Sequence, residues 1–181
     1  PPHAPVVWLD SARHHDVTGR WSILGYDPWL TLLSRGNRIE RRTSAATQVW
    51  QAHPLEALRQ VLQRYQAPAP SRVPTHVIGL MGSLSYDVNR WIEQLPAPQP
   101  SGQTVPEMLW FGMRVVALVD HLQHRAWLLS VVDPHLPVPL ARRRAHEALS
   151  WAEAQVSASW SHRGERGERP VTPKRTEGGA S

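Results

Sequence analysis

The chain has 181 residues, of which 41% are hydrophobic and only 19% charged, so it can bury a core and is not globally disordered. It has no cysteine, which excludes a disulfide scaffold, a thiolate zinc site and cysteine catalysis. No apolar run is long enough to span a membrane and no signal peptide is visible, so we expect neither membrane insertion nor secretion. The chain begins with proline instead of methionine, from which we expect a fragment of a longer protein.

The net charge of +5 comes from 20 basic and 15 acidic residues, and all but one of the basic residues are arginine. The densest basic runs are Arg38–Arg42 and Arg142–Arg144. Nucleic-acid binders usually gather such charge on one face and place aromatic residues among it, whereas most tryptophans here lie in apolar stretches. We therefore interpret both runs as solvated faces and expect no nucleic-acid partner.

Short apolar runs bounded by turn residues predict several strands in the first third of the chain. The predicted strands are Val6–Leu9, Trp21–Gly25, Trp29–Arg35 and Arg38–Thr43. Asp27-Pro28 predicts a turn between the second and third strands, and Gly36-Asn37 predicts a two-residue hairpin between the third and fourth.

A first helix is predicted over Pro54–Tyr65, where proline suits the first helical position. Its apolar residues recur at helical spacing and predict one buried stripe. That stripe consists of Leu55, Leu58, Leu62 and Tyr65.

The second half of the chain predicts an antiparallel hairpin followed by a second helix. The predicted elements are a buried strand over His76–Leu84, a short helix over Tyr86–Leu95, strands over Met108–Asp120 and Ala126–Val132, and a helix over Leu140–Gln155 with Ala145, Ala148, Leu149 and Ala152 inward. Neighbouring strands without helices between them favour an α+β fold with a mostly antiparallel sheet, two main helices and one short helix. We expect one domain over residues 1–160 and a disordered tail or linker over 161–181.

The sequence has no recognisable catalytic motif, and its ten histidines show no metal-ligand spacing. Asp10 and Ser11 follow a predicted strand directly, and Arg20 and Ser22 lie at the start of the next one. A carboxylate and hydroxyls gathered there can hold an ammonium or hydroxyl group of a small ligand. The alternative is that Asp10 and Ser11 only end the strand by local hydrogen bonds.

Five blocks of the sequence resemble, in order, the N-terminal domain of the anthranilate synthase and aminodeoxychorismate synthase component I family. They are Trp8–Ala12 (like L-L-E-S-A), Gly19–Pro28 (like G-R-Y-S-x-L-G-x-D-P), Pro54–Leu58 (like P-L-E-A-L), Gly79–Pro96 (like G-x-x-G-Y-x-x-Y-D-x-x-R-x-x-E-x-L-P), and Val105–Met108 with the stretch 115–120. Asp10 stands where the family has Glu, and Ser83 where it often has Tyr. The stretches 119–121 and 125–128 resemble the aminodeoxychorismate branch more than the anthranilate branch.

The resemblance implies a non-catalytic accessory domain of a cytoplasmic enzyme that aminates chorismate, to aminodeoxychorismate for folate or, alternatively, to anthranilate for tryptophan. It implies three further things: a chorismate-binding catalytic domain absent from this chain, which would bind Mg²⁺; a glutamine amidotransferase partner; and a tryptophan pocket. No cofactor is expected in the chain itself. Matched to the family, the pocket residues are Leu9, Asp10, Ser11, Arg20 and Ser22. A free-standing tryptophan-binding or regulatory module without catalysis is a further alternative.

Overall fold

The computed structural model describes residues 5–10, 19–66, 79–93 and 105–164, and side chains within these ranges up to residue 158. The fold is α+β with an antiparallel sheet and few helices, as predicted. Its elements are β1 (Val6–Leu9), β2 (Trp21–Arg35), β3 (Arg38–Thr43), β4 (Thr47–Gln51), α1 (Pro54–Arg64), β5 (Leu80–Leu84), the 3₁₀ helix η2 (Tyr86–Trp91), β6 (Met108–Asp120), β7 (Arg125–Ser130) and α2 (Val138–Gly164). None of the helices within these ranges is both long and apolar enough to cross a membrane.

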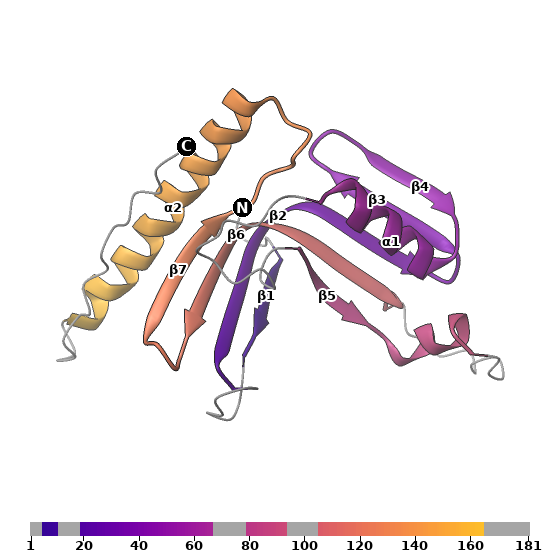
Figure 1. The fold of residues 1–181 in the computed structure, drawn as a ribbon, viewed down its shortest axis with the longest axis horizontal. Coiled ribbons are helices and arrows are strands. Elements are labelled where there is room, and N and C mark those ends of the chain that lie inside the picture. The colour runs from indigo at the N-terminus through magenta and orange to yellow at the C-terminus, as the bar shows by residue number, and fades with distance from the viewer. Residues whose placement is uncertain (1–4, 11–18, 67–78, 94–104, 165–181) are drawn as a thin grey trace.

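Two long strands, β2 and β6, pair with each other along most of their length and organise the sheet (Figure 1). The strand order is β4-β3-β2-β6-β5, and β1 and β7 add to the other ends of β2 and β6. We call the part formed by β3, β4, β5, η2, α1 and residues 30–35 and 108–112 the closed half. The open half consists of β1, β7, α2 and residues 21–26 and 115–120.

The two halves meet at a bend in β2. The pairing of β2 with β6 shifts register between Pro28 and Leu30, and Asp27 has a φ of 55°. Aspartate tolerates this left-handed conformation, and proline cannot donate to the ladder, so a bulge forms here. The prediction of a turn at Asp27-Pro28 is therefore wrong, because the chain continues through the bulge as one fifteen-residue strand.

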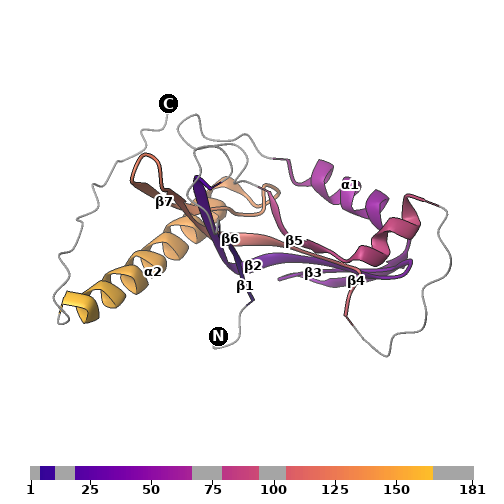
Figure 2. The ribbon, with the colours of Figure 1, turned by 90° about the horizontal axis from the view of Figure 1, so that it is seen from below.

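The closed half contains the tighter core. Leu30, Leu32, Ile39 and Met108 are fully buried between the sheet and α1. Figure 2 shows α1 lying over one side of the sheet and α2 at the opposite end of the molecule.

The helix α1 is confirmed, and its predicted inner stripe is partly correct, because Leu58 and Tyr65 are partly buried and pack against the core. The residues it buries are Pro54, Ala57 and Val61, whereas Leu62 is 45% exposed. Trp50 and Trp110 of the sheet also pack against this core. The helix residues that are buried most deeply are therefore small ones.

In the open half, α2 packs on β7 and β6 and extends further than predicted, from Val138 to Gly164. Of its predicted inward residues, Ala152 is buried, and the others are partly buried. Its backbone continues four residues past the boundary expected at residue 160. Residues 165–181, the rest of the expected tail, lie outside the described residues.

Three smaller predictions need correction. Strand β4 was not predicted at all. Strand β5 starts at Leu80, with residues 76–78 outside the described part of the chain. Within the described residues β5 pairs with β6 alone and Leu84 is 45% exposed, so it is not a buried strand. The short helix after it is a single 3₁₀ segment ending at Trp91.

Candidate ligand site

Side chains from three segments meet where β1 ends, β2 begins and β6 turns into β7. The Ser22 hydroxyl lies 2.5 Å from Asp10 Oδ1 and 2.6 Å from His121 Nε2. The pairing of β1 with β2 explains the first contact, because Leu9 lies opposite Ile23 and the next residue therefore falls beside Ser22. Asp10 is exposed, and the other two side chains are half-buried.

The direction of these hydrogen bonds follows from the groups involved. An ionised carboxylate only accepts, so the single hydroxyl proton of Ser22 is donated to Asp10. The Ser22 oxygen then accepts from His121, whose Nε2 must carry a proton. The result is a directed chain from imidazole to hydroxyl to carboxylate, which fixes the hydroxyl in one orientation.

This arrangement differs from a nucleophilic triad, in which histidine lies between the serine and the acid and removes the serine proton. Here Ser22 lies in the middle and already gives its proton to a carboxylate. The geometry therefore favours binding of a polar group over nucleophilic catalysis. Among the described residues, no group of three or more His, Asp and Glu side chains is placed to hold a metal ion.

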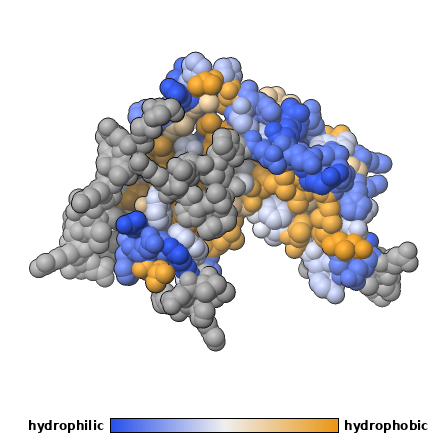
Figure 3. Space-filling model, in the orientation of Figure 1, coloured by the Kyte–Doolittle hydropathy of each residue, from blue (hydrophilic) through white to orange (hydrophobic). Residues whose placement is uncertain are grey.

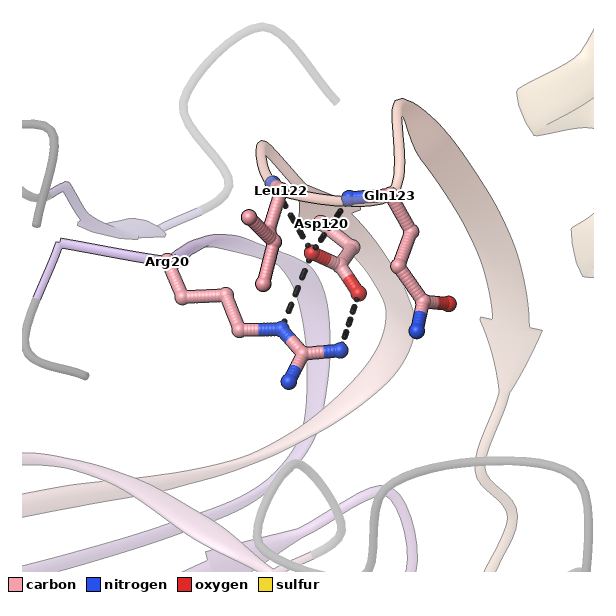
Figure 4. A network of polar contacts seen from close by, with 4 residues as sticks. All are labelled: Arg20, Asp120, Leu122 and Gln123. Carbon is pink, nitrogen blue, oxygen red and sulfur yellow. Dashed lines mark hydrogen bonds and ion pairs between the residues drawn. The ribbon is translucent and has the colours of Figure 1, made fainter. Parts of the chain in front are cut away.

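An ion pair anchors the same end of the sheet (Figure 4). Arg20 donates from Nε to Asp120 Oδ1 at 3.0 Å and from Nη2 to Oδ2 at 2.7 Å, and the Asp120 side chain is fully buried. The backbone amides of Leu122 and Gln123 also donate to Asp120 Oδ1. Hydrogen bonding from Arg20 lowers the pKa of Asp120 from its ordinary 3.8 to about 2.

The ion pair holds the turn that carries His121. The His121 amide donates to the Arg20 carbonyl oxygen at 2.8 Å, so backbone and side-chain contacts join the same two segments. The Arg20 guanidinium also lies 4.6 Å from the ring centre of Trp21. Arg20 and Asp120 thus position the imidazole that reaches Ser22.

The structure places the predicted pocket residues in different environments. Asp10 and Ser22 are in direct contact, whereas Arg20 lies at the same end of the sheet with two of its nitrogens on Asp120. Leu9 is 46% exposed, and strand alternation directs it to the face opposite Asp10. Ser11 lies outside the described residues.

Sequence reasoning did not include His121 in the site. Its signal was present in the Asp120-His121 pair that ends the longest predicted strand. Only the register of β2 with β6, which sets Trp21 opposite Asp120, reveals that this pair reaches the first residues of β2.

The chain is similar in sequence to the component 1 proteins of two synthases. No model of a protein family matches the chain. Component 1 of anthranilate synthase from Cereibacter sphaeroides is 30% identical over 152 residues, covering 78% of this chain and 30% of that protein. Component 1 of aminodeoxychorismate synthase from Bacillus subtilis is 26% identical over 127 residues, covering 70% of this chain and 26% of that protein.

A solved structure supports the fold. Anthranilate synthase component I from Streptococcus pneumoniae matches with a TM-score of 0.60 and 18% identity, over 81% of this chain and 32% of that one. The chain thus spans between about a quarter and a third of the length of the curated relatives named above.

Proposed function

This chain is a homologue of the component 1 proteins of anthranilate synthase and aminodeoxychorismate synthase, and on that basis we propose that it is their non-catalytic accessory domain, carrying a small-ligand pocket. The ligand that we propose is tryptophan, as the resemblance of the Asp10 and Ser22 segments implies.

The observation that supports the pocket is the contact between Asp10 and Ser22. An exposed carboxylate next to an oriented hydroxyl can accept hydrogen bonds from an ammonium group, which is the cationic end of every free amino acid. Because Arg20 is engaged by Asp120, we assign it to positioning His121 and not to a direct ligand contact.

Calorimetry with tryptophan tests the pocket. We expect binding heat from the chain and at least a tenfold weaker affinity for Asp10→Asn, because a charge-assisted hydrogen bond is lost. Asp87→Asn is the matched control, since it makes the same chemical change at an exposed residue of the closed half. Absence of heat from the unaltered chain would remove tryptophan from the proposal.

For the whole protein we propose amination of chorismate. The resemblance of residues 119–121 and 125–128 favours aminodeoxychorismate as the product, whereas anthranilate synthase is the more frequent name among the curated relatives and is the alternative. The product formed from chorismate by the full-length protein discriminates between the two. Anthranilate as the sole product would overturn the aminodeoxychorismate branch.

The remaining proposals concern a partner subunit, a metal ion and a further domain. The name "component 1" supports a partner subunit, which we propose to be a glutamine amidotransferase in the cytoplasm. The Mg²⁺ implied by the resemblance belongs to the proposed chorismate-binding domain, and no residue of this chain is assigned to it. A free-standing tryptophan-binding module is the alternative that a full-length protein without such a domain would favour.

A further inference from the structure

The arginine run Arg142–Arg144 does not form one solvated face, because α2 directs its three members into different surroundings. Arg142 is exposed, and Arg143 lies 3.7 Å from Glu147 on the next turn. Arg144 is half-buried and lines a cleft between α2 and the bend of the sheet. One residue of the run therefore differs from its neighbours in both burial and position.

The cleft has a volume of about 480 Å³, within the range of small-molecule sites. Its walls come from the bend of β2, from β6, from Ser44 in the turn between β3 and β4, and from α2. These segments lie far apart in the sequence and are brought together by the fold, in which α2 packs on β7 and β6.

The charges in the cleft are not balanced pair by pair. Two carboxylates, Asp27 and Glu147, and two guanidinium groups, Arg114 and Arg144, line it. Arg114 donates from Nε to Asp27 Oδ2 at 2.7 Å, and Glu147 lies 3.7 Å from Arg143. In the part of the chain that the structure describes, Arg144 makes no hydrogen bond or ion pair. A half-buried guanidinium whose N–H groups bind no acceptor is unfavourable, and an anion in the cleft would accept from those groups and relieve that cost.

The apolar part of the cleft is aromatic. The rings of Tyr26 and Trp151 stack with centroids 4.9 Å apart and an interplanar angle of 11°. Trp151 remains 45% exposed, so part of its surface is available to a ligand. Val115 and Ala148 complete an apolar wall next to the guanidinium of Arg144.

We propose that this cleft binds a small organic anion, with a carboxylate on Arg144 and a planar apolar group against Trp151. Guanidinium presents a planar fork of donors that matches a carboxylate, and aromatic surface favours a flat ring. This site is separate from the pocket at Asp10 and does not depend on it.

Benzoate is the probe, and benzamide is its uncharged counterpart. We expect benzoate to shift the indole N–H signal of Trp151 in ¹⁵N NMR spectra of the whole chain, with a dissociation constant on the order of 1 mM. The signal is assigned by its loss in Trp151→Phe. Benzamide should bind at least tenfold more weakly, because it cannot form the charge-assisted pair.

Arg144→Gln should weaken benzoate binding about tenfold or more, whereas Arg142→Gln, the same change two residues away on the exposed side, should leave it unchanged. Asp10→Asn should also leave it unchanged, which separates this site from the tryptophan pocket. Urea midpoints of the variants check that each is folded. No shift of the Trp151 signal, or equal losses in Arg142→Gln and Arg144→Gln, would overturn the proposal.

Discussion

The closed and open halves share the strands β2 and β6, and each buries apolar residues, but their exposed apolar side chains lie at different places. In the closed half, Leu32 and Ile39 are fully buried under α1. In the open half, Val116 and Leu118 of β6 are buried as well, but Val6, Trp8 and Leu24 are 54%, 68% and 38% exposed. Figure 3 adds that hydrophobic surface also remains on the lower side of the closed half, in the region of β5 and η2, where Leu84 and Ile92 are exposed.

The polar contacts described above lie mainly in the open half. The closed half buries Leu32 and Ile39 in the core that α1 covers. The open half holds the contact of Asp10 with Ser22, the anchored turn at Asp120 and the cleft at Arg144. We infer that the closed half supports the fold and that ligands are held by the open half.

The largest expected effect is on stability in the closed half. Leu32→Ala should lower the free energy of unfolding by about 2–5 kcal/mol, because it leaves a cavity in a packed core. Trp8→Ala, which removes a larger but mostly exposed side chain of the open half, should cost only about 0.5 kcal/mol. Urea denaturation measures both, and a larger loss for Trp8→Ala would reverse the comparison.

Two glycines, Gly82 in the closed half and Gly25 in the open half, test the comparison of the two halves further. A Cβ at Gly82 in β5 would lie 2.0 Å from the Leu109 carbonyl oxygen, so Gly82→Ala should displace β5 and cost about 1–3 kcal/mol. A Cβ at Gly25 would instead lie 2.6 Å from Met113 Cγ and 2.8 Å from Met81 Sδ, and these side chains can shift more readily than a strand backbone can. Gly25→Ala should therefore cost less, by the same urea measurement. Equal losses of unfolding free energy in the two variants would show that the methionine side chains cannot move aside.

The ion pair of the open half predicts an acid dependence. The pKa of Asp120 falls from 3.8 to about 2 on folding, so its ionised form stabilises the folded chain above pH 4. That contribution should disappear as the pH falls from about 4 to about 2. Asp120→Asn should lower the urea midpoint at pH 6 and flatten its change over this window.

The control for the acid dependence is Asp87→Asn, an exposed residue of the other half. It should leave the urea midpoint at pH 6 unchanged, where Asp120→Asn lowers it. If Asp120→Asn kept the full acid dependence, the Arg20–Asp120 pair would not be its source.

The last expected effect, that of Ser22→Ala, is modest in stability and concerns ligand binding as well. Its hydrogen bonds lie at a partly exposed site, so their loss should cost about 0.5–1.5 kcal/mol. The variant should nevertheless lose tryptophan affinity, because the Asp10 carboxylate is no longer oriented by its neighbour. Thermal unfolding with and without tryptophan separates these two effects.

Local patterns predicted the elements well where one conformation dominates. The bounds of β6 were predicted residue by residue, because its apolar and β-branched composition is continuous from Met108 to Asp120. The helix α1 began at Pro54 as its sequence required. Strand β4 was missed because Thr47–Gln51 is short and mostly polar, and it forms only against β3.

The site was only partly predictable, because its contacts also join segments that are far apart in the sequence. Asp10 and Ser22 stand at strand ends and were chosen on that ground, but the engagement of Arg20 by Asp120 depends on a pairing 100 residues apart. The inner face of α1 was only partly predicted: Leu58 and Tyr65 pack against the core, but Ala57 and Val61 are buried more deeply than they are. Such features arise from register and packing, which no local pattern encodes.

The continuity of β2 through the bend at Asp27 affects how the sheet unfolds. The strands β2 and β6 run through both halves without a break in the chain. If one half unfolds, these strands lose backbone hydrogen bonds next to the other half. The whole described sheet should therefore melt as one cooperative unit. Amide exchange in residues 21–26 and 30–35 should then proceed at similar, slow rates on both sides of the bulge.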